Sequence, residues 1–314
     1  MVRRGRTLIG QADMDAASGP TFEHGTLDGD GVRLHYAAAG EGPLIVFVHG
    51  FPEFWYAWRR LLVEFARDHR AVAYDQRGYN RSDKPDGVAS YRSAHLVADL
   101  AAVIRHFGRA RAIVVGHDWG GVVAWAFAIA HPEMVEKLII GNAPHPGVFA
   151  RLLAGDPDQR RASGYIAKYQ GSDAEDYLSR DDFAVLRDTV TGPGVAAGYF
   201  DDGDAAAYLA AWREEGALTA MLNFYRAMQM KPPHKDGTAA SIPAIDPASV
   251  TVAAPTLVIW GMKDRYLLPR NLDGLEDFVP DLTVHRIASA THWVFHEQPQ
   301  EATRVMRAFI ARDR

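Results

Sequence analysis

The chain has 314 residues with 48% hydrophobic and 23% charged side chains, a formal net charge of −5 at pH 7 and no cysteine. This is the composition of a soluble globular protein that can bury a large core. It excludes disulfides, thiolate chemistry and cysteine-bound metals, and without a basic excess it gives no support to binding of nucleic acid or acidic lipid.

The first 20 residues open with arginines, as some export signals do. Their apolar stretch is only TLIG, whereas a signal peptide needs about 7 to 15 apolar residues. We interpret residues 1–20 as a flexible, loosely ordered tail. The absence of cysteine leaves the compartment undecided, and a cytoplasmic enzyme fits it. No window of the sequence reaches the roughly 18 apolar residues of a membrane span, so we expect no membrane partner.

The part from residue 21 to residue 142 alternates between strand-like and helix-like patterns. Continuous apolar runs bounded by glycine are typical of buried strands, and apolar residues at helical spacing predict helices. In chain order we expect a hairpin (21–27 and 32–40), a buried strand (43–50), a helix (54–65), a strand (71–75), a helix (95–107), a buried strand (111–118), a helix (120–132) and a strand (135–142). This order implies right-handed crossovers and a mainly parallel central sheet with helices on both faces.

The strand pattern stops after residue 146. Residues 147–248 have helical periodicity without a buried strand, and strands return at 254–261 and 282–288 before an amphipathic helix that begins at Pro299. The simplest account is one α/β core, residues 21–146 and 249–314, with residues 147–248 inserted as a helical cap. Such a cap would cover the carboxyl ends of the strands, where open parallel sheets bind ligands.

The letters GHDWG, residues 116–120, have the G-x-Nuc-x-G form of a nucleophile elbow between a strand and a helix. The glycines permit a tight turn that lifts the central side chain clear of the sheet. Asp118 occupies this centre, where many hydrolases have serine. The pattern alone also fits an ordinary strand-to-helix turn with a surface aspartate.

An acid and a histidine follow in the chain order that this motif requires. Asp264 comes after the first strand beyond the insertion, and His292 comes after the last strand. We expect His292 to act as a general base, with Asp264 fixing its tautomer and stabilising its protonated form. We expect His296 to cap a helix or face solvent, and His49 and His117 to support neighbouring motifs.

From about Phe22 onward the chain resembles the epoxide hydrolases of the α/β-hydrolase fold. The resemblance rests on HGFPEFWYAW (49–58), DQRGYNRSDKP (75–85), GHDWGG (116–121), the loop of Asp264 and HWVFHEQP (292–299). Asn80 and Thr291 stand where the family usually has glycine, which affects loop geometry but removes no reacting group. The resemblance implies an α/β-hydrolase fold with an inserted helical cap and hydrolysis of epoxides.

The family has two cap tyrosines that bind the epoxide oxygen. Tyr165 in SGYIAKYQ and Tyr225 in LNFYRAM match these positions, and Tyr169, one helical turn after Tyr165, competes for the first of them. The alternative for Tyr225 is a core residue, because it also lies on an apolar helical stripe.

The resemblance further implies a two-step reaction without metal or organic cofactor. The Asp118 carboxylate attacks an epoxide carbon to form an ester, and His292 then activates water for attack on that ester. Serine in place of the aspartate would give an ether that cannot be hydrolysed in this way. The backbone N–H groups of Phe51 and Trp119 are expected to bind the tetrahedral oxyanion. The product is a vicinal diol.

The substrate pocket is expected to be apolar, with Phe51, Trp55, Trp119 and Phe224 in its lining. We therefore expect a small apolar epoxide and water as the reactants. The protein itself is expected to be a monomer or a homodimer.

The HGFPE motif is expected to support this site through His49, Gly50, Pro52 and Glu53. A tight bend at Phe51 predicts a cis peptide bond before Pro52, since only X-Pro bonds adopt cis at low cost. For Glu53 two interpretations stay open: a hydrogen bond with a nearby amide or water, or a favourable interaction with the helix dipole.

Two other functions fit parts of the pattern. A haloalkane dehalogenase uses the same aspartyl ester, and Trp119 suits a halide-binding indole. That function needs a second N–H donor to the halide. The donor is usually an asparagine, at the position that Phe51 occupies here, or a cap tryptophan. The sole cap tryptophan, Trp212, lies in a polar helix. A fluoroacetate-type dehalogenase would have arginine at position 119. A non-catalytic ligand-binding member of the fold would lack one of the three catalytic groups.

Overall fold

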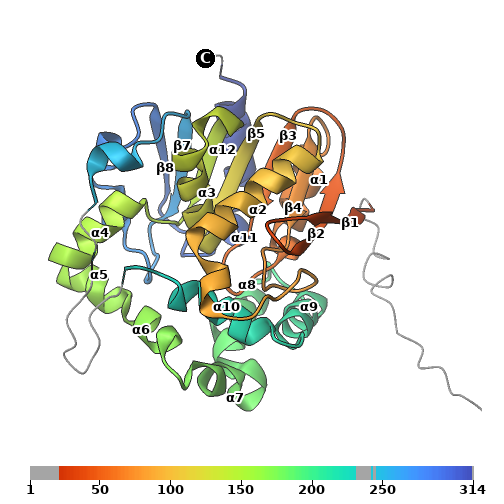
Figure 1. Cartoon of the computed structure of the whole chain (residues 1–314), viewed down its shortest axis with the longest axis vertical. Helices are drawn as coiled ribbons and strands as arrows, with labels where there is room; N and C mark the ends of the chain where they lie inside the picture. Colours follow the sequence, from red (N-terminus) through yellow and green to blue (C-terminus); the bar gives the residue numbers. More distant parts are fainter. Residues whose placement is uncertain (1–20, 231–241, 243–244, 313–314) are drawn as a thin grey trace, which may run out of the picture.

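The structure is a computed structural model of the whole chain, and it describes residues 21–230, 242 and 245–312. The tail expected at residues 1–20 and the part of the expected cap at 231–241 and 243–244 lie outside the described residues. Figure 1 shows a sheet flanked by helices in the upper part of the view and a separate group of helices below it.

One eight-stranded sheet forms the centre of the molecule, in the order β1-β2-β4-β3-β5-β6-β7-β8. β1 and β2 form the predicted hairpin, β2 and β4 are also antiparallel, and all other neighbours are parallel. The prediction of a mainly parallel sheet is therefore confirmed. The strands are β1 (Glu23–Asp28), β2 (Arg33–Ala39), β3 (Leu44–Val48), β4 (Arg70–Tyr74), β5 (Ala112–His117), β6 (Val135–Gly141), β7 (Thr256–Gly261) and β8 (Leu282–Ile287).

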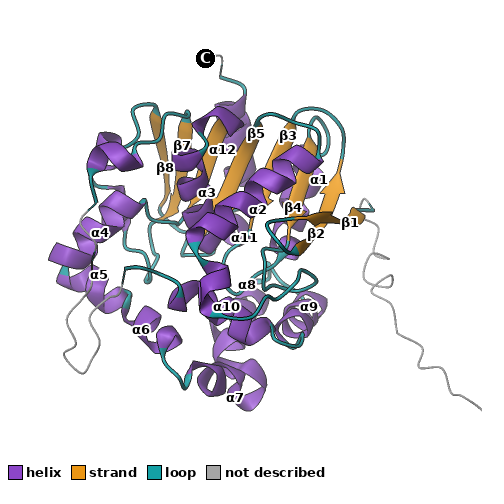
Figure 2. Ribbon diagram, in the orientation of Figure 1, coloured by secondary structure: helices purple, strands orange, loops and turns teal. Residues whose placement is uncertain are grey.

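Helices cover both faces of the sheet. In Figure 2, α2 and α3 lie in front of the strands, and α1 and α12 pack against each other on the other face. All residues of β3, β5 and β7 are buried as a result, which explains why their sequences are continuous apolar runs. The core helices are α1 (Arg59–Phe65), α2 (Ser93–His106), α3 (Trp119–Ala130), α11 (Val294–Glu297) and α12 (Pro299–Ile310).

The helix predicted at 54–65 differs in its first turn. A 3₁₀ turn covers Trp55–Trp58, and α1 begins only at Arg59. The backbone N–H of Trp55 donates to Asp75 Oδ1 at 2.9 Å, so the end of β4 fixes the start of this segment. Tertiary contact thus overrides the local helical pattern.

The segment between β6 and β7 is helical, and none of its described residues lies in a strand. Figure 1 shows its helices at the end of the sheet where α3 and α10 approach each other. The division into core and cap at residues 147 and 248 stays a prediction. These helices are α4 (Pro146–Gly155), α5 (Pro157–Ala162), α6 (Gly164–Gln170), α7 (Ala174–Leu186, non-helical at 180–183), α8 (Gly192–Ala197), α9 (Asp202–Trp212) and α10 (Ala217–Arg226).

Over the described residues, every helix is too short or too polar to cross a bilayer.

Candidate active site

Asp118 lies at a sharp turn between β5 and α3. Its backbone has φ 50° and ψ −123°, a conformation that costs a non-glycine residue on the order of 1–3 kcal/mol. The turn is tight enough that a side chain at Gly120 would collide with the carbonyl of Val48. The geometry is therefore that of an elbow, with the carboxylate raised above the carboxyl end of β5.

The acid, the histidine and the elbow carboxylate meet as one chain of contacts. His292 Nδ1 lies 2.8 Å from Asp264 Oδ2, and His292 Nε2 lies 3.4 Å from Asp118 Oδ2. All three side chains are buried. The structure thus brings together the three residues that the sequence places 146 and 28 positions apart (264 − 118 and 292 − 264).

The charged groups in this chain of contacts determine the protonation states of His292 and Asp264. Burial lowers the pKa of His292, but the carboxylates of Asp264 and Asp118 outweigh burial and raise that pKa well above its usual value. For Asp264, burial raises the pKa, whereas His292 and two backbone amides lower it, with a net decrease. An ionised Asp264 beside a protonated imidazole is the arrangement that these shifts favour.

Asp264 has more partners than the sequence indicated. The backbone N–H groups of Tyr266 and Leu267 donate to Oδ1 at 2.8 and 3.0 Å, and Asn142 Nδ2 donates to Oδ2 at 2.7 Å. Asn142 follows β6, and its own Oδ1 accepts from the Gly261 amide. Sequence reasoning missed Asn142, although its place directly after a buried strand was a usable signal.

One of the two expected oxyanion donors already binds the carboxylate. The Phe51 backbone N–H donates to Asp118 Oδ1 at 2.7 Å. The Phe51–Pro52 peptide bond is cis, as predicted. A Cβ at Gly50 would lie 2.6 Å from Asp118 Oδ1, so glycine is required for this close approach. Within the described residues the Trp119 N–H makes no hydrogen bond to Asp118, although it follows the carboxylate directly at the start of α3.

His49 supports the loop that carries Phe51. Its Nε2 accepts from the Gln76 amide at 3.0 Å, which leaves Nδ1 to donate to the Gly50 carbonyl at 2.9 Å. Complete burial lowers the pKa of His49, and its neighbours only partly offset this. A neutral imidazole therefore fixes the backbone next to the elbow.

Glu53 is a buried residue that joins the loop after β3 to the helix α9, and neither interpretation from the sequence describes it. Its Oε1 accepts from Tyr208 of α9 at 2.8 Å and lies 2.6 Å from His296 Nε2. Its Oε2 lies 3.3 Å from His117 Nδ1, and His117 Nε2 donates to the His292 carbonyl at 2.8 Å. Burial raises the pKa of Glu53, but its two histidine neighbours hold it well below the usual range.

Two expectations near this junction were wrong. His296 neither caps a helix nor faces solvent: it is 5% exposed and pairs with Glu53. The helix of Trp212 was expected to be polar, yet Trp212 is 2% exposed and its indole N–H donates to the Pro52 carbonyl at 2.6 Å. Both contacts join segments that are far apart in the sequence.

Three tyrosines face the elbow from the inserted helices. Tyr165 and Tyr169 come from α6 and Tyr225 comes from α10, and their rings pack against one another. None of their hydroxyls is hydrogen-bonded to another described residue. Burial, followed by neighbouring groups that include the Asp118 carboxylate, raises the pKa of all three phenols. They are therefore protonated and able to donate.

Two cavities adjoin Asp118. One of about 40 Å³ lies between Asp118, His292 and the three tyrosines, and Phe51 lines it. The other, of about 790 Å³, extends from Asp118 along α3 and α10 and is lined by Trp119 and Phe224. Tyr165 and Tyr225 line both cavities, whereas Tyr169 lines only the smaller one. Tyr165 is therefore the tyrosine of α6 that both cavities reach.

The expected position of Trp55 in the pocket is corrected. Trp55 lines neither cavity and instead packs against Phe22 and His24 beside β1. The hydrogen bond from the Trp55 backbone N–H to Asp75 turns this part of the chain away from the elbow. Among the described residues there is also no cluster of three acidic or histidine side chains that could hold a metal ion.

Comparison with known proteins agrees with this geometry. The protein family described as alpha/beta hydrolase fold matches residues 43–299. The chain is 40% identical to the AB hydrolase superfamily protein YfhM of Bacillus subtilis, over 90% of this chain and 95% of that protein. It is 35% identical to epoxide hydrolase 3 of Xenopus tropicalis, over 90% of this chain and 76% of that protein.

A solved structure is similar at the level of the whole chain. The epoxide hydrolase of Bacillus megaterium, crystallised with an inhibitor, superimposes with a TM-score of 0.84 and 40% identity, over 92% of this chain and all of that one. The fold and the elbow thus define a hydrolase of the α/β type. More narrowly, the chain belongs to the branch of the α/β-hydrolase fold family that contains the epoxide hydrolases.

Proposed function

We propose that this protein hydrolyses epoxides to vicinal diols through a covalent ester of Asp118. The observation that carries the proposal is the position of one carboxylate. Oδ1 of Asp118 is held by the Phe51 amide, and Oδ2 is directed toward His292 at the small cavity that Tyr165 and Tyr225 line. The carboxylate thus has one oxygen anchored and one oxygen available for attack.

The first step is the opening of the ring. Asp118 Oδ2 forms a bond to an epoxide carbon, and the C–O bond of that carbon to the ring oxygen breaks. The ring oxygen takes a proton from Tyr165 or Tyr225, which stabilise it as it gains charge. Both phenols are protonated because burial raises the pKa of each.

The second step is hydrolysis of the ester. His292 removes a proton from water, and the resulting oxygen nucleophile attacks Cγ of Asp118. The former carbonyl oxygen, Oδ1, becomes an oxyanion beside the Phe51 N–H that already contacts it. When the intermediate collapses, the bond from Cγ to the substrate oxygen breaks, and this oxygen takes the second proton of the attacking water and leaves in the diol. The proton on His292 returns to the deprotonated tyrosine.

The dehalogenase alternative is less well supported. A leaving halide needs two N–H donors, and the Trp212 indole is already bonded to the Pro52 carbonyl. The indole of Trp119 lines the large cavity, and the indole N–H of Trp293, which lines the small cavity, already donates to the Thr189 carbonyl at 3.2 Å. A non-catalytic role is disfavoured by the complete contact chain from Asp118 to Asp264.

A direct comparison of substrates tests the function. Purified protein is incubated with styrene oxide and, separately, with a bromoalkane, and diol and bromide are measured. We expect diol only. Bromide without diol would establish the dehalogenase alternative, and neither product would favour a ligand-binding protein.

The ester can be tested in a single turnover with excess enzyme in heavy-oxygen water. We expect an unlabelled diol, because its new oxygen comes from Asp118, and label in the Asp118 carboxylate. Label in the first diol released would mean that water attacks the epoxide directly. In His292→Gln, mass spectrometry of the intact protein should show the accumulated ester, and Asp118→Ala serves as the control that cannot form it.

A further inference from the structure

A buried glutamine lies where the inserted helices meet the acid loop, residues 262–271, which follows β7 and carries Asp264. Gln159 belongs to α5, whose sequence PDQRRA is mostly polar. Every other residue of this helix is exposed or half-buried, whereas Gln159 is 0% exposed. Burial of a side-chain amide costs free energy unless its polar atoms are hydrogen-bonded, so the partners of Gln159 indicate why it is held inside the protein.

The Gln159 amide uses its full capacity for hydrogen bonds. Nε2 donates to Ser163 Oγ at 2.8 Å and to the Tyr266 carbonyl at 2.9 Å. Oε1 accepts from the Leu268 backbone N–H and from Asn271 Nδ2, each at 2.9 Å. A carboxamide has two N–H donors and two acceptor lone pairs, so these four bonds satisfy it. Three of the four partners belong to the acid loop.

The contacts of Gln159 and those of Asp264 meet at one peptide group. The Tyr266 carbonyl and the Leu267 N–H belong to the same rigid, planar unit. Gln159 Nε2 binds the carbonyl end of this unit, and its N–H end donates to Asp264 Oδ1 at 3.0 Å. Because the unit is rigid, the amide of the helix residue fixes the direction of a bond to the acid. His292 Nδ1 lies 2.8 Å from the other oxygen of the same carboxylate.

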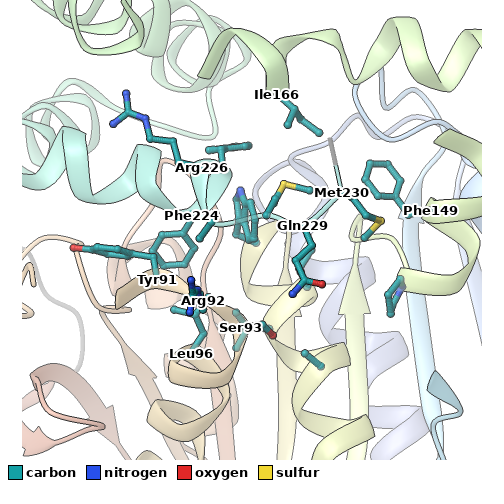
Figure 3. A pocket seen from close by; sticks show the side chains of 18 of the residues that line it. Tyr91, Arg92, Ser93, Leu96, Phe149, Ile166, Phe224, Arg226, Gln229 and Met230 are labelled. Carbon is teal, nitrogen blue, oxygen red and sulfur yellow. The ribbon is translucent and has the colours of Figure 1, made fainter. Parts of the chain in front are cut away.

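The side chain of Tyr266 extends this connection to the reacting groups. Its ring centroid lies 5.6 Å from that of the His292 imidazole and 5.5 Å from that of the Tyr165 phenol, and all three rings line the small cavity. The remaining bond of the buried amide reaches Ser163, which directly precedes α6, the helix of Tyr165. In Figure 3, Ile166 of the same helix points into the large cavity.

We propose that Gln159 is a positioning residue that holds the acid loop, so that Asp264 keeps His292 aligned for the attack of water on the ester. The inference rests on the proposed function for the reaction but not for the alignment itself. Gln159 lines neither cavity and acts through the peptide group between Tyr266 and Leu267. The segment between β6 and β7 thus contributes to the alignment of the base.

Two substitutions remove the contact in different ways. Gln159→Met has a similar length but lacks the amide, so it loses all four bonds. Gln159→Asn keeps the amide on a stem that is one CH2 shorter, so we expect it to lose the bonds to the acid loop. A misplacement of about 1 Å far from the reacting atoms can cost about a hundredfold in rate. We expect ester hydrolysis to slow by about tenfold in each variant, and ester formation to slow less.

Rapid quenching of single turnovers with styrene oxide measures both rates for each folded variant. The control for a simple loss of stability is Val135→Ala. Val135 is 1% exposed and begins β6, at the opposite edge of the sheet from the carboxyl end of β5. It should lower Tm but leave both rates nearly unchanged. Unchanged hydrolysis in both Gln159 variants, or an equal decrease in Val135→Ala, would overturn the proposal.

Hydrogen exchange tests the same connection without substrate. The amides of Tyr266 and Leu267 donate to Asp264 and not to Gln159, so their exchange reports how well the acid is held. We expect both amides to exchange faster in the two Gln159 variants than in the wild type. Val135→Ala should not produce this local difference, because its loss of stability is not confined to the acid loop.

The pKa of His292, followed by NMR titration, gives a second measurement that needs no epoxide. Burial lowers this pKa and the Asp264 and Asp118 carboxylates raise it, with a net increase. A less firmly held Asp264 attracts the imidazolium less, so the pKa should be lower in Gln159→Met. Absence of ester and diol with the wild type would refute the proposed function alone. Unchanged amide exchange and an unchanged His292 pKa in both Gln159 variants would refute the positioning role alone.

Discussion

The protonation state of His292 is expected to depend on the charge of Asp118. In the proposed reaction His292 is a general base and must be neutral, yet Asp264 and Asp118 raise its pKa well above the usual value against the opposing effect of burial. The proposed esterification would remove the charge of Asp118, and with it one source of that increase. The pKa of His292 should therefore be lower in the ester than in the free enzyme, so the base becomes available when it is needed.

Asp118→Asn imitates the uncharged ester and tests this coupling. We expect NMR titration of the His292 imidazole to give a lower pKa in the variant than in the wild type, because the attraction of Asp118 is lost. Asp158→Asn, on the exposed surface, serves as the charge-matched control. An unchanged or higher pKa in Asp118→Asn would contradict the coupling.

The tyrosines can be distinguished by single hydroxyl deletions. Tyr225→Phe and Tyr165→Phe should each slow ring opening by about a hundredfold, since each removes a donor to the developing charge. Tyr169→Phe is the matched control and should have a smaller effect, because Tyr169 lines only the small cavity. Pre-steady-state quenching measures the rate of ester formation. Equal decreases in this rate in Tyr165→Phe and Tyr169→Phe would contradict the proposal that Tyr165 is a donor to the ring oxygen.

At the scale of elements, α9 is attached to the core by buried polar contacts. Tyr208 donates to Glu53, and Trp212, four residues later on the same helix, donates to the Pro52 carbonyl. Glu53 also meets histidines from β5 and α11. One loop of the core thus supplies both the Phe51 amide of the site and the contacts that position a helix of the insertion.

Glu53→Gln should destabilise the fold in a pH-dependent way. The folded-state pKa of Glu53 lies well below its ordinary value of 4.5, so its ionised form contributes stability above about pH 4.5, and that contribution is lost as the pH falls through the folded pKa. The difference in Tm between wild type and variant should be largest above this pH and shrink below it. Glu41→Gln, at an exposed position, is the control and should leave Tm nearly unchanged. A difference independent of pH would show that the charge of Glu53 does not act as described.

The sequence predicted the elements better than the contacts between them. The strands follow from continuous apolar runs, and the elbow, Asp264 and His292 follow from their places after strands β5, β7 and β8. The partners of Glu53 and the role of Asn142 did not follow, because each depends on a neighbour more than 60 positions away in the chain. The prediction that Trp55 lines the pocket was wrong because an aromatic-rich motif does not reveal which of its rings turn toward the elbow.

At the scale of the whole molecule, the three residues of the contact chain come from the sheet, whereas much of the cavity lining comes from helices. Asp118, Asp264 and His292 follow strands β5, β7 and β8 of the same sheet, and hydrogen bonds and buried packing fix these strands. The large cavity also draws on α2, α4, α6 and α10. Its shape and polarity therefore depend on how the helices lie over the sheet, which local sequence patterns do not specify.

The pairing of β6 with β7 has a consequence for how such a molecule can diversify. Leu138 lies opposite Thr256 in this parallel pair, so a segment longer than 100 residues leaves the carboxyl end of β6 and returns to the amino end of the adjacent strand. Exchange or lengthening of that segment leaves the register of the strands intact, and with it the distance between base and nucleophile. New substrate ranges can thus arise from changes in the inserted helices that keep the positions of Tyr165 and Tyr225, the proton donors of the proposed ring opening.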